Sequence, residues 1–234
     1  YIGLPTAAVL ASRGYSIHGV EVNPAAIETI NSGKAHIVEP DLDMLVQAGV
    51  QTGRLKAYDK PTESDIFMIC VPTPLTDERK PELKYVRAAT ETICPYLRPG
   101  NLVILESTSP PGTTEMIAAI VKEKTGLGPP DLHFAHAPER VLPGKILREV
   151  IENDRIVGGI DEASTEHCAE FYRQFVSGEL LLTNARTAET AKLVENAYRD
   201  VNIAFANELS LMSEELDVDV WELIDLANRH PRVN

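Results

Sequence analysis

Tyr1-Ile2-Gly3-Leu4-Pro5-Thr6-Ala7-Ala8-Val9-Leu10-Ala11 opens the chain, and the strand-like run Ser16-Ile17-His18-Gly19-Val20-Glu21-Val22-Asn23 follows it. In the first stretch, glycine and alanine recur at helical spacing, which lets a helix pack closely on a sheet. The free N–H groups and the positive dipole end at the start of such a helix suit a pyrophosphate. Residues 1–23 therefore predict a dinucleotide-binding helix followed by a strand.

Glu21 stands where an acid would recognise the adenosine ribose of a dinucleotide. It lies 18 residues after Gly3, close to the tip of the second strand of such a fold. A carboxylate there favours NAD, because the 2′-phosphate of NADP would meet a like charge. The complete fingerprint reads G-x-G-x-x-G, of which only the last glycine is present, as Gly3. Taken alone, these residues would equally suit an ordinary helix between two strands with a surface acid.

Composition narrows the classes of function. The 234 residues are 44% hydrophobic and 24% charged, which suits one full α/β domain plus an extra element. The formal net charge of −13 argues against a nucleic-acid partner, because binding a phosphate backbone requires clustered Lys and Arg. No apolar run approaches the roughly 18 residues that a membrane-spanning helix requires, so no membrane partner is expected.

The cysteines and histidines indicate neither a disulfide framework nor a metal site. Cys70, Cys94 and Cys168 are scattered and form no C-x-x-C pair, which favours the reducing cytoplasm as the compartment. His133 and His136 are three apart in a predicted strand, where this spacing points them to opposite faces. We therefore expect no bound metal.

Strand-like and helix-like segments alternate along most of the chain. The pattern predicts helices over 25–31, 41–48 and 84–97, and strands over 66–71, 102–106, 132–137 and 155–158. Such alternation predicts a Rossmann-like, doubly wound α/β fold, in which a parallel sheet has helices on both faces. Ligands of these folds bind at the carboxyl ends of the strands. The candidate functional residues at such ends are Glu21, Thr73, Thr108 and Glu139.

The alternation of strand-like and helix-like segments ends at about residue 187, and we take this position as a domain boundary. Apolar residues then repeat every three or four positions, from Ala191 to Leu209, and predict a long helix over 189–217. At about 1.5 Å per residue, such a helix is long enough to leave one domain and bridge to another. We therefore expect a nucleotide-binding domain at 1–186 and a helical dimerisation domain at 187–234.

Two loops carry residues suited to chemistry. In the turn 106–114, after a predicted strand, hydroxyl and amide groups could hold a nicotinamide or an ordered water. Alone, that turn is equally typical of a strand-to-helix connection capped by Thr113 or Thr114. Glu139, in the segment 137–145, suits a general base, although loop carboxylates are usually solvated.

The helical part carries two further candidates. Lys192 and Asn196 are four apart and so share one helix face, where an amine and an amide suit the stabilisation of an oxyanion. A charge beside an amide is also common on ordinary helix surfaces. Near the end of the sequence, Arg232 suits an anion, or else belongs to a basic tail without a role.

A series of motifs, met in order, resembles one known enzyme family. The chain contains Y-I-G-L-P, G-V-E-V-N, C-V-P-T-P, E-S-T-S-P-P-G-T, P-E-R-V-L-P-G-K, N-D-R-I-V-G-G, K-L-V-E-N-A-Y and N-E-L. In order and spacing they resemble the nucleotide-sugar 6-dehydrogenases of the UDP-glucose/GDP-mannose dehydrogenase family, over essentially the whole chain. P-E-R-V-L-P-G-K-I-L followed by N-D-R-I-V-G-G is most similar to the members that oxidise UDP-N-acetyl-D-mannosamine.

The resemblance implies two α/β domains joined by a long central helix. This chain would hold the first domain and the helix, without the C-terminal UDP-binding domain. The implied reaction passes two hydrides in turn to NAD, so that the C6 alcohol of a UDP-sugar becomes an aldehyde and then a carboxylate. A cysteine thiolate captures the aldehyde, the second oxidation gives a thioester, and water releases the acid. The family also implies a homodimer built around the central helix.

The same resemblance implies roles for catalytic residues by position. Glu139 would be the base that acts on water, and Thr108 would help to position that water. Lys192 and Asn196 would hold the oxyanion and its hydrogen-bond network, and would contact the substrate.

Binding roles follow from the resemblance as well. The residues expected to line NAD are Ile2, Gly3, Glu21, Thr73 and Thr108. The backbone of Arg140, Val141 and Leu142 would bind the substrate, and Arg232 would reach the substrate of the partner subunit.

Three features depart from the family pattern. Pro143 stands where UDP-glucose members have a second glutamate, and the first glycines of the fingerprint are absent. The nucleophilic cysteine of the family, in a G-G-H-C type segment, would lie beyond Asn234. No cysteine of this chain matches it, and Cys70 falls in a buried-strand pattern typical of core. The chain alone is therefore expected to be inactive.

Alternatives remain open at this point. The sugar could be UDP-N-acetylglucosamine or UDP-glucose instead. A β-hydroxyacid dehydrogenase that uses Lys192 would explain Lys192, Asn196 and the lack of a matching cysteine, but not the P-E-R-V-L-P-G-K segment. A non-enzymatic NAD-binding module is a third possibility.

Overall fold

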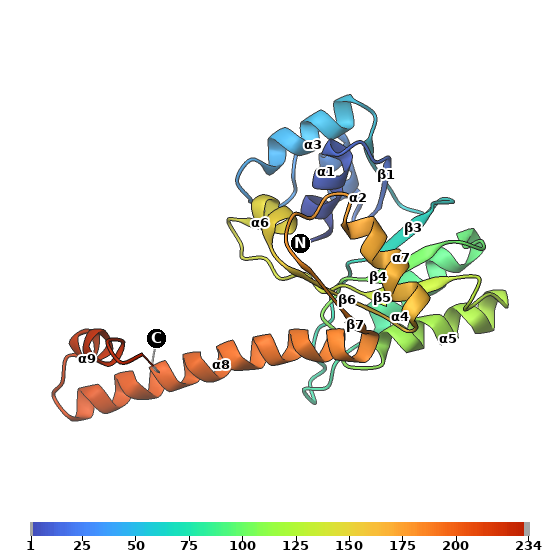
Figure 1. Ribbon diagram of the computed structural model, residues 1–234. Coiled ribbons are helices and arrows are strands. Elements are labelled where there is room, and N and C mark those ends of the chain that lie inside the picture. The colour runs from blue at the N-terminus through green and yellow to red at the C-terminus, as the bar shows by residue number, and fades with distance from the viewer. Residues whose placement is uncertain (1, 232–234) are drawn as a thin grey trace. The chain divides into compact units, whose positions relative to one another are not determined.

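Figure 1 shows the helices and strands of residues 2–231, the part of the chain that the computed structural model describes. The α-helices are α1 (Gly3–Ser12), α2 (Pro24–Asn31), α3 (Leu42–Gln51), α4 (Lys84–Ile93), α5 (Thr113–Thr125), α6 (Ile146–Glu152), α7 (Glu162–Tyr172), α8 (Ala185–Glu215) and α9 (Val220–Ala227). A short 3₁₀ helix, η1 (Cys94–Tyr96), follows α4. The strands are β1 (Ile17–Val20), β2 (Leu55–Tyr58), β3 (Ile66–Ile69), β4 (Leu102–Leu105), β5 (His133–His136), β6 (Arg155–Gly159) and β7 (Leu180–Asn184). These elements form two compact units, one that ends at Lys192 and one that begins at Leu193.

The strands of the first unit form two sheets. β1 and β2 pair in parallel, and a five-stranded sheet has the order β3-β4-β5-β6-β7. The pairs β3–β4, β4–β5 and β6–β7 are parallel, whereas β5–β6 is antiparallel. The predicted α/β fold with a parallel sheet is confirmed, and the one departure among the described strands is β6, which runs antiparallel to β5. The segment 137–154 brings the chain back into the sheet at the edge where β5 ends, and such a return produces an antiparallel pair.

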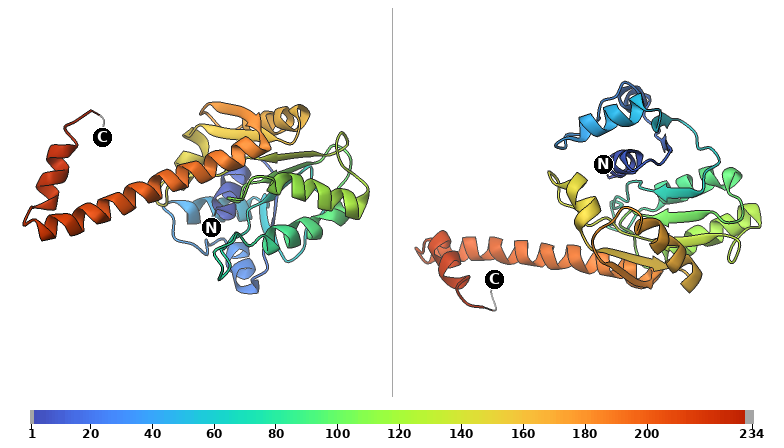
Figure 2. Two further views of the ribbon diagram at one scale, coloured as in Figure 1. Left: turned by 90° about the horizontal axis from the view of Figure 1, so that it is seen from below. Right: turned by 45° about the horizontal axis from the view of Figure 1, so that its top comes forward.

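Helices cover both faces of the five-stranded sheet. On one face, Phe67, Val103 and Phe134 pack against α4 and α5. On the other face, Leu102 and Ala135 pack against α1, α6 and α7. This division follows from the alternation of side chains along a strand. In Figure 2, α4 and α5 lie together along the sheet, while α1, α2 and α3 lie together at β1 and β2.

The helix α1 packs against both sheets. Val9 and Leu10 join the core under the five-stranded sheet, and Leu4, Ala8 and Ala11 join the core beside β2. Ala8 and Ala11 are almost completely buried, which a larger side chain would prevent. The small residues at the start of the chain therefore allow the close packing that the sequence predicts.

The predicted elements are present with shifted ends. The helix expected over 84–97 ends at Ile93, because Pro95 turns the next residues into η1. The long helix expected from 189 begins at Ala185, and Asn184 Oδ1 accepts a hydrogen bond from the N–H of Thr187 at 2.9 Å. The sequence pattern does not reveal β2, α6, α7 or β7, because each is short or weakly periodic.

The second unit comprises α8 from Leu193 onward and α9. Asp217, with φ of 54°, turns the chain after α8. Asp219 then caps α9, because its Oδ1 accepts from the N–H groups of Trp221 and Glu222 at 2.8 and 3.2 Å. Within residues 2–231, no helix is both long enough and apolar enough to cross a membrane.

Candidate active site

The loops that follow β3 and β4 are joined by hydrogen bonds at one edge of the sheet. Thr73 Oγ1 donates to the carbonyl of Thr108 at 2.7 Å, and Ser107 Oγ donates to the carbonyl of Val71 at 2.7 Å. Since β3 and β4 are parallel, both loops leave the sheet at the same edge. The structure thus brings together two residues selected from the sequence, Thr73 and Thr108, both half-buried.

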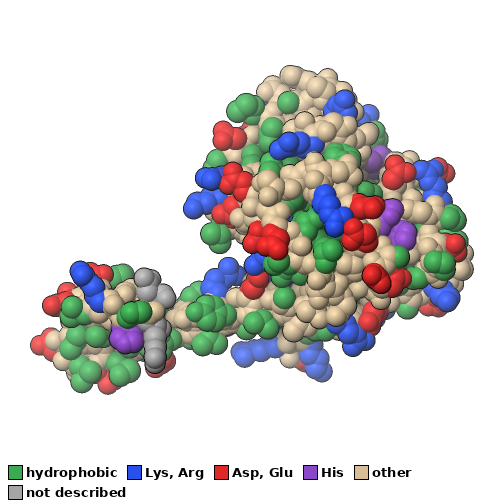
Figure 3. Space-filling model, in the orientation of Figure 1, with side chains coloured by type: hydrophobic (Ala, Val, Ile, Leu, Met, Phe, Trp, Pro, Cys, Tyr) green, Lys and Arg blue, Asp and Glu red, His purple; other side chains and the backbone are tan. Residues whose placement is uncertain are grey.

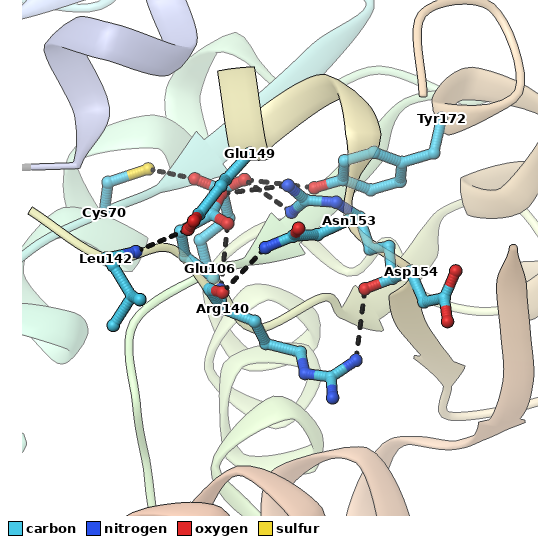
Figure 4. A network of polar contacts seen from close by, with 10 residues as sticks. Cys70, Glu106, Arg140, Leu142, Glu149, Asn153, Asp154 and Tyr172 are labelled. Carbon is cyan, nitrogen blue, oxygen red and sulfur yellow. Dashed lines mark hydrogen bonds and ion pairs between the residues drawn. The ribbon is translucent and has the colours of Figure 1, made fainter. Parts of the chain in front are cut away.

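A buried polar cluster lies at the same edge (Figure 4). Glu106 follows β4, Glu139 follows β5, Arg155 is the first residue of β6, and Tyr172 ends α7. Because β6 is antiparallel to β5, its first residue arrives at the edge where β4 and β5 end. Glu106 is 3% exposed, Arg155 4% and Glu139 8%. Glu139 is therefore buried among other charged side chains, and is not the solvated loop carboxylate that its position in sequence would equally allow.

Arg155 bridges the two carboxylates of this cluster. Its Nη2 donates to Glu139 Oε2 at 2.9 Å, and its Nη1 lies 3.6 Å from Glu106 Oε1. Glu106 also accepts from the Tyr172 hydroxyl at 3.1 Å and from the Cys70 thiol at 3.0 Å. The guanidinium lies over the Tyr172 ring, 4.7 Å from its centroid. Buried charges persist where they are paired and hydrogen-bonded in this way.

The burial of this cluster shifts the pKa values of its members. Burial, and then the negative charge of Glu139, raises the pKa of Glu106 to about 7. Burial, with Glu106 beside it, raises the pKa of the Cys70 thiol well above its ordinary value. Cys70 is therefore a neutral hydrogen-bond donor at neutral pH, which does not suit a nucleophile. Glu106, by contrast, changes its protonation near neutral pH.

The backbone of the loop after β5 is held in place by side chains (Figure 4). Glu149 Oε2 accepts from the N–H of Leu142 at 2.7 Å, and Asn153 Nδ2 donates to the carbonyl of Arg140 at 3.1 Å. The N–H of Arg140 donates to Glu139 Oε1 at 2.8 Å. The side chain of Leu142 is nevertheless 51% exposed. This loop therefore combines a fixed backbone with an exposed apolar side chain, an arrangement suited to holding a ligand.

Glu39 fixes the far end of this loop. Its buried carboxylate accepts from the N–H groups of Gly144 and Ile146, at 3.0 and 2.8 Å, where α6 begins. Val141 packs on the core beside α6. Glu39 lies between α2 and α3, so this contact links the β1–β2 side of the unit to the loop after β5.

The start of α1 is suited to a phosphate. Gly3 is its first residue, and its first turn contains no acidic side chain, so the positive helix end is not compensated. A Cβ at Gly3 would lie 3.3 Å from Cβ of Cys70, which leaves little room for a larger residue. Glu21 follows β1, is half-buried, and accepts from the N–H of Asn23 at 2.9 Å. Ile2 packs against the core just before α1. Amides for a pyrophosphate and a carboxylate for a ribose fit a dinucleotide.

Lys192 lies on α8 within the first unit, near the buried end of β5. His136 ends β5 and is fully buried. Burial lowers the pKa of His136 to about 4, and the positive charge of Lys192 lowers it too. Asn196 belongs to the second unit, where its Oδ1 accepts from Arg199 Nη2 at 3.2 Å. Arg232 lies outside the described residues.

Glu189 anchors the start of α8 to the start of α5. Its buried carboxylate accepts from the N–H of Gly112 at 2.6 Å, the N–H of Thr114 at 2.8 Å and the Thr114 hydroxyl at 2.7 Å. The alternative in which Thr113 or Thr114 caps α5 is wrong, because the N-cap is Gly112 and Glu189 supplies the acceptor. The turn after β4 is thus fixed by a residue far along the chain.

Apolar side chains are exposed along α8 and α9 in the second unit (Figure 3). Those at least half exposed are Val194, Tyr198, Val201, Ile203, Phe205, Leu211, Met212, Leu216, Trp221 and Leu226. Large apolar patches of this kind mark interaction surfaces.

The structure contains no group of three His, Cys, Asp or Glu side chains within residues 2–231 that could hold a metal ion.

Sequence reasoning did not select Glu106, Arg155 or Tyr172 for the site. Glu106 and Arg155 each stand at one end of an otherwise apolar strand segment. A charged residue at the end of an apolar strand is the sequence feature that could have indicated these two residues. It does not reveal the partner, because the meeting of Arg155 with Glu106 depends on the antiparallel direction of β6.

Comparison with known proteins agrees with this architecture. The NAD binding domain of the UDP-glucose/GDP-mannose dehydrogenase family matches residues 1–176, and the central domain of that family matches residues 186–234. An NDP-N-acetyl-D-galactosaminuronic acid dehydrogenase of Ralstonia nicotianae is 54% identical over 100% of this chain and 57% of its own length. A UDP-N-acetyl-D-mannosamine dehydrogenase of Campylobacter jejuni is also 54% identical, over 100% of this chain and 60% of its own.

Solved structures agree as well. The UDP-D-ManNAc dehydrogenase from Pyrococcus horikoshii is 47% identical, with a TM-score of 0.96 over 99% of this chain and 56% of that one. The chain thus spans less than two thirds of the length of these relatives. The two family matches together set aside the β-hydroxyacid dehydrogenase alternative. The chain belongs to the UDP-glucose/GDP-mannose dehydrogenase family.

Proposed function

We propose that the protein containing this chain is an NAD-dependent nucleotide-sugar 6-dehydrogenase, and that it oxidises the C6 alcohol of UDP-N-acetyl-D-mannosamine to a carboxylate. The observation that carries this proposal is 54% identity along the whole chain to a UDP-N-acetyl-D-mannosamine dehydrogenase. The equal identity to an NDP-N-acetyl-D-galactosaminuronic acid dehydrogenase favours, as second candidate, a nucleotide-linked N-acetylgalactosamine. UDP-N-acetylglucosamine and UDP-glucose rank after these two.

The first unit supplies the NAD site in this proposal. The free amides at Gly3 would bind the pyrophosphate, with Ile2 beside them, and Glu21 would bind the adenosine ribose. Thr73 and Thr108, joined by their hydrogen bond, would line the nicotinamide end. When bound, NAD supplies the hydride acceptor for both oxidations.

Proton transfer and charge stabilisation fall to other residues. Glu139 would take a proton from the water that cleaves the thioester, with Thr108 positioning that water. Lys192 and Asn196 would stabilise the oxyanion by charge and hydrogen bonding. The backbone of 140–142, fixed by its hydrogen bonds, would hold the sugar nucleotide.

The cysteine nucleophile would come from outside residues 1–234. Cys94 and Cys168 are buried, and burial raises the pKa of both thiols. Free thiols also suit the cytoplasm as the compartment.

We propose further that the protein is a homodimer joined through the helical domain expected from the sequence, residues 187–234. The exposed apolar residues of α8 and α9 support this, because an isolated chain would leave them in water. Arg232 would then reach the substrate of the partner subunit. Replacing Phe205 by Asp in the full-length protein should give a monomer in analytical ultracentrifugation, whereas Val22→Asp, at an exposed site in the first unit, should leave the dimer intact.

The reaction is tested by counting NADH, through its absorbance, per molecule of limiting sugar nucleotide. The full-length protein should form about two NADH per UDP-N-acetyl-D-mannosamine, as a four-electron oxidation requires. Parallel reactions with UDP-N-acetylgalactosamine, UDP-N-acetylglucosamine and UDP-glucose identify the preferred sugar. One NADH per sugar, or none with any of the four, would contradict the proposal.

A further inference from the structure

The buried cluster of Glu106, Glu139 and Arg155 holds an excess of negative charge when both carboxylates are ionised. One guanidinium then faces two carboxylates, and all three side chains are at most 8% exposed. A net charge in the protein interior is costly, and a proton on one carboxylate removes it. Geometry points to Glu106 as the carboxylate that takes this proton, because Arg155 is closer to Glu139.

Among residues 2–231, the other titratable neighbours of Glu106 do not offset this charge. Besides Glu139 and Arg155, these neighbours are Cys70 from the loop after β3 and Cys168 and Tyr172 from α7. Burial raises the pKa of each of these three groups, so each is neutral at neutral pH. The charge of the cluster therefore depends on the proton of Glu106.

The guanidinium of Arg155 can move when Glu106 gains or loses its proton. Its Nη2 bonds Glu139 at 2.9 Å, but its buried Nη1 has no hydrogen-bond partner among residues 2–231 and lies 3.6 Å from Glu106 Oε1. A hydrogen bond of ordinary length, about 2.9 Å, would need a movement of less than about 1 Å. An ionised Glu106 would attract Nη1 and complete this bond.

We propose that Arg155 and Glu106 are positioning residues for Glu139, and that loss of the proton from Glu106 draws Arg155 toward Glu106 and makes Glu139 the stronger base. This inference rests on the proposed function, in which Glu139 accepts a proton from water. With Glu106 protonated, Arg155 pairs with Glu139 alone and offsets its negative charge. With Glu106 ionised, Arg155 is shared between the two carboxylates and offsets the charge of Glu139 less.

The step that Glu139 assists is the hydrolysis of the thioester. Glu139 takes one proton from water, the water oxygen bonds to the carbonyl carbon, and the carbon–sulfur bond breaks to release the thiolate. A carboxylate has about four acceptor positions, so Glu139 retains capacity for water beside Arg155 and the N–H of Arg140. No electrons are exchanged in this step.

The test compares the full-length wild-type enzyme with Glu106→Gln. Formation of the sugar carboxylate is followed by rapid quench in a single turnover with NAD and UDP-N-acetyl-D-mannosamine, from about pH 6 to about pH 9. In the wild type, the hydrolysis rate should rise roughly tenfold across neutral pH. In Glu106→Gln, that rise should be absent and the rate should stay at the low-pH value of the wild type, with KM unchanged.

A matched control is Glu166→Gln, which removes an exposed carboxylate paired with Arg173 at 2.6 Å. Its profile should superimpose on that of the wild type. A Glu106→Gln profile that also superimposes on the wild type would overturn the inference. Failure of the wild type to form any NADH would instead overturn the proposed function, so the two failures are distinguishable.

A second readout requires no turnover. The infrared carbonyl band of a protonated carboxylic acid should be present in the full-length wild type and disappear as the pH rises through neutrality. Glu106→Gln should lack this band. Tyr172→Phe removes a donor to Glu106, so the band should persist to higher pH. A wild-type spectrum without such a band would overturn the inference.

Discussion

Replacing Glu106 by Gln is expected to change how the stability of the protein depends on pH. The pKa of Glu106 is raised to about 7 in the folded protein, chiefly by burial, from an ordinary value of 4.5. The folded state holds this proton more tightly than the unfolded state. The resulting stabilisation is therefore complete below the ordinary value and is lost as the pH rises through about 7. By linkage, the loss between about pH 5 and about pH 8 is roughly 2 to 3 kcal/mol.

The assay is urea unfolding of the full-length wild type and Glu106→Gln at a series of pH values, followed by circular dichroism. The difference between the two free energies of unfolding removes the contribution of titrating groups that lie far from Glu106. That difference should move by roughly 2 to 3 kcal/mol in favour of the variant from about pH 5 to about pH 8. Glu166→Gln should follow the wild type. If the free energies of unfolding of the wild type and Glu106→Gln change in parallel with pH, Glu106 does not lose a proton near neutral pH and the reasoning is refuted.

Three further substitutions test contacts that hold the site. Glu189→Ala removes the acceptor of two N–H groups at the start of α5 and should lower the free energy of unfolding by about 3 kcal/mol; a loss in urea titrations below about 0.5 kcal/mol would contradict this. Gly158→Ala places a Cβ 2.4 Å from the carbonyl oxygen of Asn184 and should lower the free energy of unfolding by about 1 to 3 kcal/mol. An unchanged midpoint of urea unfolding would contradict this packing. Glu39→Ala should speed hydrogen exchange of the amides at 144 and 146, measured by mass spectrometry, while exchange in β4 stays slow; equal exchange in both proteins would show that Glu39 does not fix this loop.

The sequence predicted four strands of the five-stranded sheet, β3 to β6, and the residues at their ends. β3 and β4 read as apolar runs because helices cover both faces of the sheet. Glu21, Thr73 and Glu139 could be selected because each follows such a run, and parallel strands end at one edge. These features are local, so a single sequence contains them.

Other parts of the site could not be predicted in this way. The direction of β6 is not encoded in its own residues, yet it decides that Arg155 lies between Glu106 and Glu139. The capping of α5 by Glu189 joins residues far apart in the sequence, where local propensity favours a nearby threonine. Both contacts arise from tertiary packing, which periodicity does not record.

The role of Glu139 is tested most simply by intact-mass measurement of the full-length Glu139→Gln variant after mixing with NAD and UDP-N-acetyl-D-mannosamine. Glutamine keeps the size of the side chain but cannot take a proton from water. We predict that the variant forms two NADH per subunit, stops, and carries one covalently attached sugar nucleotide. Unmodified protein that continues to turn over at the wild-type rate would contradict the assignment of Glu139 as the base.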